Sequence, residues 1–180
     1  RLSLAMVERC GVTPSSSVID VGAGASVFVD DLLDHGFTDL TALDISAAAL
    51  TVASARLGAA ASTVTWVAAD LLTWTPRRTF DVWHDRAVLH FLTEGHDRDR
   101  YRVALDAATH PGSVVVIAAF APDGPQTCSG LPVRRYDVDD IAALLETGWS
   151  LVAEDREEHT TPSGGVQPFT WAAFRRSSRG

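Results

Sequence analysis

Apolar positions along the chain alternate between the spacing of strands and that of amphipathic helices. The predicted strands are Ser17–Val21, Leu40–Leu43, Val64–Ala68, Phe80–Trp83 and Val114–Phe120. The predicted helices are Leu2–Arg9, Val27–Leu33, Ser46–Leu57, Arg98–Thr109 and Asp137–Leu145. Strands that alternate with helices in this way predict a parallel sheet with helices on both of its faces.

The C-terminal part of the chain has a different pattern. The segments Ser150–His159 and Phe169–Phe174 alternate, and the turn-forming residues between them are Pro162, Ser163, Gly164 and Gly165. We therefore expect a doubly wound, mostly parallel seven-stranded α/β sheet that ends in an antiparallel hairpin. Residues 1–180 are expected to form a single domain. The chain begins at Arg1, which leaves open that a native N-terminal segment is missing.

Composition and charge narrow the class of partner. The formal net charge at pH 7 is −8, and such a surface repels phosphates, so nucleic acid is not an expected partner. No apolar run is long enough to span a bilayer, so no membrane partner is expected. The two cysteines, Cys10 and Cys128, form no disulfide framework and have no metal-ligand spacing. We expect a cytoplasmic protein that binds no metal.

The segment Val18–Ser26 (VIDVGAGAS) leaves a strand and enters a helix. Gly22 and Gly24 let the backbone turn tightly and approach a ligand, although plain strand–helix turns also contain such glycines. A dinucleotide site requires a third glycine, and Val27 stands at that position. Asp20 would repel a pyrophosphate but could hold the ammonium group of an amino acid. The turn therefore favours a zwitterionic ligand.

Two further carboxylates end the next two predicted strands. Asp44 could accept hydrogen bonds from both hydroxyls of a ribose, although it or Ser46 could instead cap the following helix. Asp70 could accept from the exocyclic amine of adenine, although a loop aspartate in water would look the same. Ligands of doubly wound sheets bind beyond the carboxyl ends of the strands, where Asp20 also lies. The three residues together favour an adenosine with an amino-acid part.

These segments resemble the class I S-adenosylmethionine-dependent methyltransferases. The matching stretches are Val18–Ser26, Leu40–Ser46, Val67–Leu72 and Phe80–Leu89. The resemblance implies that S-adenosylmethionine is the cofactor and S-adenosylhomocysteine its product. It implies that the cofactor-binding residues are Asp20, Gly22, Ala23, Gly24, Asp44, Ile45, Asp70 and Leu71. Within this superfamily the chain is similar to a group of small bacterial methyltransferases through Trp83–Leu92, Cys128–Tyr136 and the hairpin around His159.

Candidate residues for the chemistry follow the predicted fourth strand, in the charged turn His84–Arg86 and the helical turn after it. The resemblance places His84 and Asp85 near the transferred methyl group, where either could act as a base or orient the acceptor. His90 is a further catalytic candidate or simply a packed histidine. Arg86 could bind an acidic substrate or form a salt bridge with Asp85.

Two residues from the C-terminal half are further candidates for substrate binding. Cys128 lies in a loop that could close over the site, and an inert thiol is the alternative. His159 lies on the hairpin, where ordinary strand pairing is the alternative.

We therefore predict an enzyme that moves a methyl group from S-adenosylmethionine to an oxygen, nitrogen or sulfur atom of a small molecule. A protein lysine methyltransferase is the alternative enzyme, and an exposed acidic groove beside His84 would favour it. The alternative outside the enzymes is a protein that binds the cofactor as a sensor without catalysing transfer. The residues do not identify the acceptor or the oligomeric state.

Overall fold

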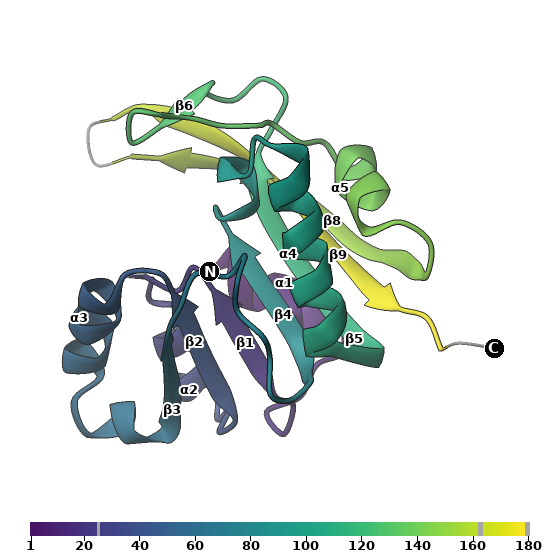
Figure 1. Ribbon diagram of the computed structural model, residues 1–180. Coiled ribbons are helices and arrows are strands. Elements are labelled where there is room, and N and C mark those ends of the chain that lie inside the picture. Colours follow the sequence, from purple (N-terminus) through teal and green to yellow (C-terminus); the bar gives the residue numbers. More distant parts are fainter. Residues whose placement is uncertain (25, 162–163, 179–180) are drawn as a thin grey trace.

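The computed structural model describes residues 1–24, 26–161 and 164–178. The strands of its main sheet are β1 (Val18–Val21), β2 (Leu40–Asp44), β3 (Val64–Ala68), β4 (Phe80–Arg86), β5 (Thr109–Phe120), β8 (Trp149–Thr160) and β9 (Val166–Arg176). Their order in the sheet is β3-β2-β1-β4-β5-β9-β8 (Figure 1). The first five pair in parallel, and β9 pairs antiparallel with β5 and β8. The predicted seven-stranded, mostly parallel sheet with a terminal hairpin is confirmed.

Helices cover both faces of this sheet (Figure 1). They are α1 (Leu2–Arg9), α2 (Phe28–Asp34), α3 (Ala47–Leu57), α4 (Gly95–Ala108) and α5 (Val138–Leu145), with short 3₁₀ helices η1 (Gly58–Thr63) and η2 (Leu89–Phe91). One core cluster joins the sheet to α1, α2 and α3 through residues such as Met6 and Leu32. A second cluster joins it to α4 and α5 through residues such as Leu105 and Ile141. The sheet is therefore buried on both faces, as a doubly wound fold requires.

The predicted charged turn at His84–Arg86 is wrong, because these residues belong to β4. Asp85 lies opposite Val21 of β1 and Ile117 of β5, so the ladder continues on both sides of the strand. His84 and Asp85 are buried there, and each has a hydrogen-bond partner within the fold. Polar side chains with internal partners can occupy a central strand, which the alternation of apolar residues alone does not reveal.

The boundary between α4 and β5 also differs from the predicted one. The helix begins at Gly95 and ends at Ala108, and β5 begins at Thr109 rather than at Val114. Thr109 pairs with Phe80, and the register then shifts before Val82 pairs with Val114. This irregularity accommodates Pro111, which has no N–H group for a strand ladder.

The segment around Cys128 was expected to be a loop and instead forms a small hairpin. Its strands are β6 (Thr127–Cys128) and β7 (Leu131–Pro132). Ser129 and Gly130 connect them with φ angles of 52° and 80°, as a two-residue turn with two left-handed residues requires. In the larger β8–β9 hairpin, the predicted turn residues Pro162 and Ser163 lie outside the described residues. Within the described parts of the chain, none of the helices has the length and apolar character needed to cross a membrane.

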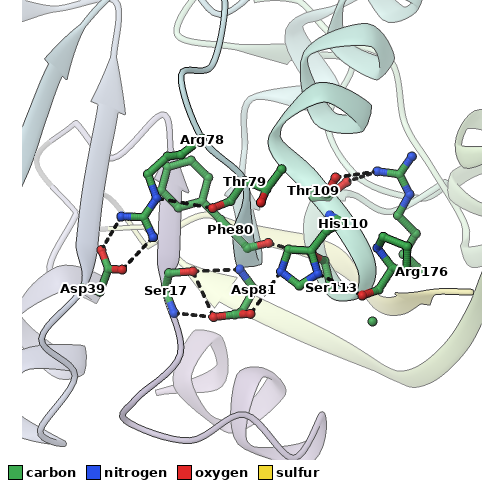
Figure 2. A network of polar contacts seen from close by, with 12 residues as sticks. Ser17, Asp39, Arg78, Thr79, Phe80, Asp81, Thr109, His110, Ser113 and Arg176 are labelled. Atoms are coloured by element: carbon green, nitrogen blue, oxygen red, sulfur yellow. Dashed lines mark hydrogen bonds and ion pairs between the residues drawn. The ribbon is translucent and has the colours of Figure 1, made fainter. Parts of the chain in front are cut away.

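A network of polar side chains joins the strands at their amino ends (Figure 2). The Asp81 carboxylate accepts hydrogen bonds from the N–H and the hydroxyl of Ser17 at 2.7 and 2.9 Å. Its other oxygen lies 3.1 Å from Nε2 of His110. Nearby, Arg78 forms two hydrogen bonds to Asp39 at 2.9 and 2.6 Å. These contacts hold β1, β2, β4 and β5 together at the edge opposite the glycine turn.

We predict that Asp81→Asn lowers the free energy of unfolding by about 1 kcal/mol at pH 7, a typical cost for hydrogen bonds at a half-exposed site. Burial tends to raise the pKa of Asp81, but hydrogen bonds from Ser17 and His110 outweigh it and hold the pKa below its ordinary value. The carboxylate therefore stabilises the fold above the ordinary pKa, and this contribution disappears as the pH falls through the lowered pKa.

Urea unfolding at pH 7 and pH 3 measures this difference. The deficit of the Asp81→Asn variant should shrink at pH 3. Asp34→Asn, at an exposed position of α2, is the control and should change stability little at either pH. An equal deficit for Asp81→Asn at both values would contradict the prediction.

Candidate active site

The glycine turn between β1 and α2 lies close to two other segments. Gly22 has a φ of +70°, and a Cβ atom there would lie 2.1 Å from Cγ2 of Val88. Gly24 has a φ of +44°, and its Cβ would lie 3.3 Å from Oδ2 of Asp44. Both positions therefore need glycine, for backbone conformation and for the closeness of neighbouring side chains. Ala23 lies between them and is buried.

A cavity of about 600 Å³ lies beside this turn, at the carboxyl ends of the parallel strands. We call it the glycine-turn cavity. Its lining residues are Val21, Gly22, Leu43, Asp44, Ile45, Ala69, Asp70, Leu71, Leu72, Val88, Phe91, Leu92, Thr93, Leu131 and Pro132. The lining is mostly apolar, and its carboxylates come from the ends of neighbouring strands. This combination suits a nucleoside, with apolar walls for the base and acceptors for its hydroxyl and amino groups.

Asp44 is the last residue of β2, Ile45 follows it, and both line this cavity. Oδ1 of Asp44 accepts a hydrogen bond from the N–H of Ser46 at 2.7 Å. The cap of α3 is Ser46, whose hydroxyl accepts from the N–H of Ala49 at 3.2 Å. Asp44 is therefore not used as the cap, and its Oδ2 has no hydrogen-bond partner among the described residues. Ile45 is 75% exposed and lines the cavity, so its side chain is available to contact a ligand there.

Asp70 and Leu71 line the same cavity after β3. Oδ1 of Asp70 accepts a hydrogen bond from the N–H of Leu72 at 2.9 Å, which shapes the turn. Leu71 is buried. The β6–β7 hairpin adds Leu131 and Pro132 to the wall. Leu131 is largely exposed although it borders an apolar cavity. The structure thus brings five of the predicted cofactor-binding residues to one cavity, which are Gly22, Asp44, Ile45, Asp70 and Leu71.

Asp20 lies in β1 just before the glycine turn and does not line the glycine-turn cavity. Its Oδ1 atom lies 2.7 Å from Nδ1 of His84, which is the residue opposite it on β4. Both side chains are almost completely buried. Oδ2 of Asp20 and Nε2 of His84 have no hydrogen-bond partner within the described parts of the chain. The pair therefore links β1 to β4 and leaves one imidazole nitrogen unused.

Asp85 projects to the opposite face of β4 and is fully buried. Its carboxylate accepts hydrogen bonds from the N–H groups of Val88 and Leu89 at 2.8 and 3.2 Å and from the Tyr101 hydroxyl at 2.8 Å. The Tyr101 oxygen in turn accepts from Nε1 of Trp83 at 3.2 Å. Burial raises the pKa of Asp85 to about 6, and the hydrogen bonds oppose a larger rise. Asp85 thus holds in place the Val88 that contacts Gly22.

His90 lies in η2 and is completely buried. Its ring lies 4.4 Å from that of Phe120 and 4.6 Å from that of Phe91, measured between centroids. Neither ring nitrogen has a hydrogen-bond partner among the residues described. Burial lowers the pKa of His90 to about 4, and the charge of Arg86 adds to this effect. The imidazole is therefore neutral at pH 7.

A second cavity, of about 470 Å³, lies between α2 and the β8–β9 hairpin. We call it the hairpin cavity. Its lining residues are Arg1, Leu2, Ser3, Ser26, Val27, Phe28, Asp31, Arg86, Glu157, His159 and Trp171. Two of the predicted substrate-binding residues, Arg86 and His159, therefore face one space. The His84 ring lies 4.0 Å from that of Phe28 and 6.2 Å from that of Trp171, directly behind this wall.

The remaining predicted residues lie elsewhere. Cys128 is half-buried on the β6–β7 hairpin and lines neither cavity. Ala23 and Gly24 shape the turn without lining the glycine-turn cavity. Arg86 does not pair with Asp85, because successive residues of β4 project to opposite faces. Within the described ranges, no group of three or more histidine, cysteine or acidic residues is arranged to hold a metal ion.

Three residues at the glycine turn and the hairpin cavity were not predicted from the sequence. Val88 contacts the glycine turn, and Glu157 and Trp171 form part of the hairpin cavity. Nε1 of Trp171 donates a hydrogen bond to Oε2 of Glu157 at 3.0 Å. The alternation along β8 could have placed Glu157 beside His159, since residues two apart share a face. Nothing in the sequence indicated that Val88 lies against Gly22.

Comparison with known families identifies the class of this protein. Residues 18–112 match the family model of the methyltransferase domain, which is more than half of the chain. The chain therefore belongs to the methyltransferase domain family, as the resemblance predicted, and it is an enzyme of the methyltransferase class. No curated protein sequence matches the chain.

Solved structures of similar fold include several methyltransferases. One comes from work on the conversion of a disulfide bond into a thioacetal group during echinomycin biosynthesis. Its sequence is 23% identical to this chain, the TM-score is 0.76, and the alignment covers 99% of this chain and 82% of the other. Another is the Burkholderia thailandensis 1,6-didemethyltoxoflavin-N1-methyltransferase with bound 1,6-didemethyltoxoflavin and S-adenosylhomocysteine. It is 21% identical with a TM-score of 0.73, and the alignment covers 98% of this chain and 80% of the other. The N-methyltransferase NodS from Bradyrhizobium japonicum WM9 is 18% identical with a TM-score of 0.76, and the alignment covers 98% of this chain and 95% of the other. These likenesses support the Rossmann-like methyltransferase fold.

We predict that Gly22→Ala lowers the free energy of unfolding by about 2–4 kcal/mol, because the new methyl group meets Val88 and the backbone keeps a positive φ. Gly11→Ala is the matched control. Gly11 has a φ of +69°, and no neighbouring atom lies within 4 Å of the place that its Cβ would take, so only the backbone cost of about 1 kcal/mol applies. Urea unfolding of both variants measures the difference, and equal losses would contradict the contact with Val88.

We predict that His90→Phe flattens the loss of stability on acidification. The folded pKa of His90 is about 4, below its ordinary value of 6.5. The unfolded chain therefore binds more protons between these values, and His90 costs increasing stability as the pH falls through them, up to about 3 kcal/mol. The difference between variant and parent should grow from pH 7.5 to pH 5 in urea unfolding. His96→Phe, at an exposed histidine, should not change the pH dependence, and a parallel shift for His90→Phe would contradict the assignment.

Proposed function

We propose that this methyltransferase takes a methyl group from S-adenosylmethionine and transfers it to an oxygen, nitrogen or sulfur atom of a small-molecule acceptor. The observation that carries the proposal is the pair of cavities at the carboxyl edge of the sheet. The glycine-turn cavity has the groups that a nucleoside needs, and the hairpin cavity has aromatic walls and polar side chains. Two of the similar structures, those of the toxoflavin enzyme and NodS, are small-molecule or N-methyltransferases, which supports this interpretation.

The residues of the glycine-turn cavity fit the cofactor. Asp44 has a free carboxylate oxygen for the ribose hydroxyls, and the exposed Ile45 can cover one face of the adenine. Asp70 and Leu71 lie where the adenine edge would be recognised. The backbone at Gly22 and Gly24 can approach the methionine part without obstruction from side chains. When bound, S-adenosylmethionine supplies an electrophilic methyl group on a sulfonium with a good leaving group.

Asp20 and His84 form a pair, and we therefore assign them roles that differ from those expected of each residue alone. Because Asp20 is paired with His84, we assign it to orienting the imidazole rather than to binding an ammonium group directly. In the neutral ring, Nδ1–H donates to Asp20 and leaves the lone pair on Nε2. A histidine oriented by a carboxylate is a suitable proton acceptor. However, Nε2 of His84 is buried and His84 lines neither cavity, so we assign the pair of Asp20 and His84 to supporting the wall of the hairpin cavity behind Phe28 and Trp171.

The other candidates divide between positioning and acceptor binding. Asp85 positions Val88 against the glycine turn through its two backbone hydrogen bonds. His90, neutral and packed among aromatic rings, supports the wall beside Arg86. Arg86 and His159 contact the acceptor in the hairpin cavity. Cys128 belongs to the β6–β7 hairpin, which covers the glycine-turn cavity.

The charges of the hairpin cavity favour a small molecule over a protein lysine. A lysine acceptor would be guided by unpaired carboxylates. The two carboxylates that line this cavity are each near an arginine, with Asp31 at 3.6 Å from Arg1 and Glu157 at 3.5 Å from Arg86. The cavity is thus not the acidic groove that a lysine substrate would require.

A transfer assay with methyl-labelled S-adenosylmethionine and a library of metabolites tests the proposed function. Label should appear in at least one low-mass product that depends on the enzyme. Label found only in added proteins would instead indicate a protein methyltransferase. Binding of S-adenosylhomocysteine without transfer to any acceptor would indicate a sensor.

We predict that Asp44→Asn weakens the binding of S-adenosylhomocysteine by about 1.5–3 kcal/mol, because it removes charge-assisted hydrogen bonds to the ribose. Asp39→Asn is the matched control, since Asp39 immediately precedes the same strand at its other end and pairs with Arg78. Isothermal calorimetry of both variants measures the change. Unchanged affinity in Asp44→Asn, or an equal loss in Asp39→Asn, would contradict the ribose assignment.

A further inference from the structure

We infer that the hairpin cavity recognises acceptors that carry a carboxylate or a similar planar anionic group beside a flat ring, with Arg86 as the anion-binding residue. The inference rests on the proposed function, because it names the class of acceptor for that site. It assigns a further role to Glu157 and Trp171, which hold the cavity in shape.

Arg86 is held in position before any ligand binds. It is the last residue of β4, and its guanidinium lies over the Phe169 ring, 4.7 Å from the centroid. Nη2 lies 3.5 Å from Oε2 of Glu157, and the side chain is 33% exposed. Phe169 therefore supports one face of the guanidinium, while Glu157 limits its movement. A side chain fixed in this way loses little conformational entropy when it binds an anion.

The pairing of Arg86 is weak compared with other arginines of the chain. Arg78 and Arg156 each form two hydrogen bonds of 3.0 Å or less to a single aspartate, as saturated guanidinium–carboxylate pairs do. Arg86 has a single long contact, and Glu157 is its only hydrogen-bond partner among the described residues. Most of its N–H groups are therefore available to a ligand in the cavity that it lines.

Glu157 is not equally available to bind a cation. Its Oε2 atom already accepts the hydrogen bond from Nε1 of Trp171 at 3.0 Å. Its Oε1 atom lies 3.8 Å from Nδ1 of His159, which also lines the cavity. The other carboxylate of the lining, Asp31, faces Arg1. Oδ2 of Asp31 has no hydrogen-bond partner among the described residues, and its nearest cation is Arg1 at 3.6 Å. The unused donors of the lining that an anion could satisfy are those of Arg86.

The walls of the hairpin cavity suit a flat ring. Trp171 is buried and its orientation is fixed by the hydrogen bond to Glu157. Phe28 is buried on the α2 side, and Val27 and Leu2 add apolar surface. A volume of about 470 Å³ is within the usual range for small-molecule sites. Aromatic walls beside a guanidinium that can form two parallel hydrogen bonds match an aromatic carboxylate.

Calorimetry on the full chain saturated with S-adenosylhomocysteine tests this inference with three probes of nearly equal shape. They are 4-hydroxybenzoate, the uncharged 4-hydroxybenzamide and the cationic 4-hydroxybenzylamine. The benzoate should bind about tenfold or more tightly than the amide, as expected for a charge-assisted pair, and the amine should bind most weakly. Equal affinities, tighter binding of the amine, or no binding of the benzoate at millimolar concentration would overturn the inference.

Substitutions then locate the preference. Arg86→Gln should remove the preference for the benzoate over the amide, and Arg86→Lys should keep part of it, since lysine retains the charge without the planar pair of donors. Arg156→Gln is the matched control. It makes the same change of charge next to Glu157, at an exposed position of β8, and should leave the preference unchanged. A preference that survives in Arg86→Gln would overturn the assignment of that residue.

Glu157→Gln provides a readout of opposite sign, so that a folding defect cannot imitate the result. The glutamine oxygen can still accept from Trp171, while the competing negative charge is lost. Binding of the benzoate should therefore tighten by about threefold or more. Weaker binding of the benzoate together with weaker binding of the amine would contradict the role given to Glu157.

The same titrations separate this inference from the proposed function. Failure of the unmodified chain to bind S-adenosylhomocysteine would contradict the proposed function itself. Binding of S-adenosylhomocysteine and transfer of label to some acceptor, without a preference for the carboxylate, would overturn the inference alone.

Discussion

The close contact between Gly22 and Val88 is the constraint on which the site depends. It lets the glycine turn lie against the segment that follows β4, and only glycine leaves room for the Val88 side chain. Val88 is fixed because Asp85 accepts the hydrogen bond of its N–H group, and Tyr101 and Trp83 complete the chain of contacts behind Asp85. The position of the segment beside the glycine turn is therefore fixed by buried hydrogen bonds.

The alternation of β4 divides its polar residues between the two faces of the sheet. His84 projects toward Asp20, and Asp85 projects toward Tyr101 on the opposite face. Arg86, at the carboxyl end, reaches the hairpin cavity. These three adjacent residues thus have different surroundings, because His84 pairs with Asp20, Asp85 holds the segment at Val88, and Arg86 lines the hairpin cavity. Their closeness in the sequence does not make them one catalytic cluster.

The strands of the sheet, the glycine turn and the strand-end residues Asp44 and Asp70 could be predicted from the sequence, because they depend on local periodicity and on where parallel strands end. The strand character of His84–Arg86 could not, because it depends on partners, Asp20 and Tyr101, that are distant in the sequence. The same holds for Glu157 and Trp171, whose contact requires the register of β8 and β9. The local pattern of apolar and polar residues carries no information on side-chain pairs between distant parts of the chain.

The fit of the glycine-turn cavity to S-adenosylmethionine rather than to a dinucleotide underlies the proposed function. Parallel calorimetric titrations of the unmodified chain with S-adenosylhomocysteine and with NAD test it most directly. We expect micromolar binding of S-adenosylhomocysteine and no measurable binding of NAD. Binding of NAD without binding of S-adenosylhomocysteine would contradict it.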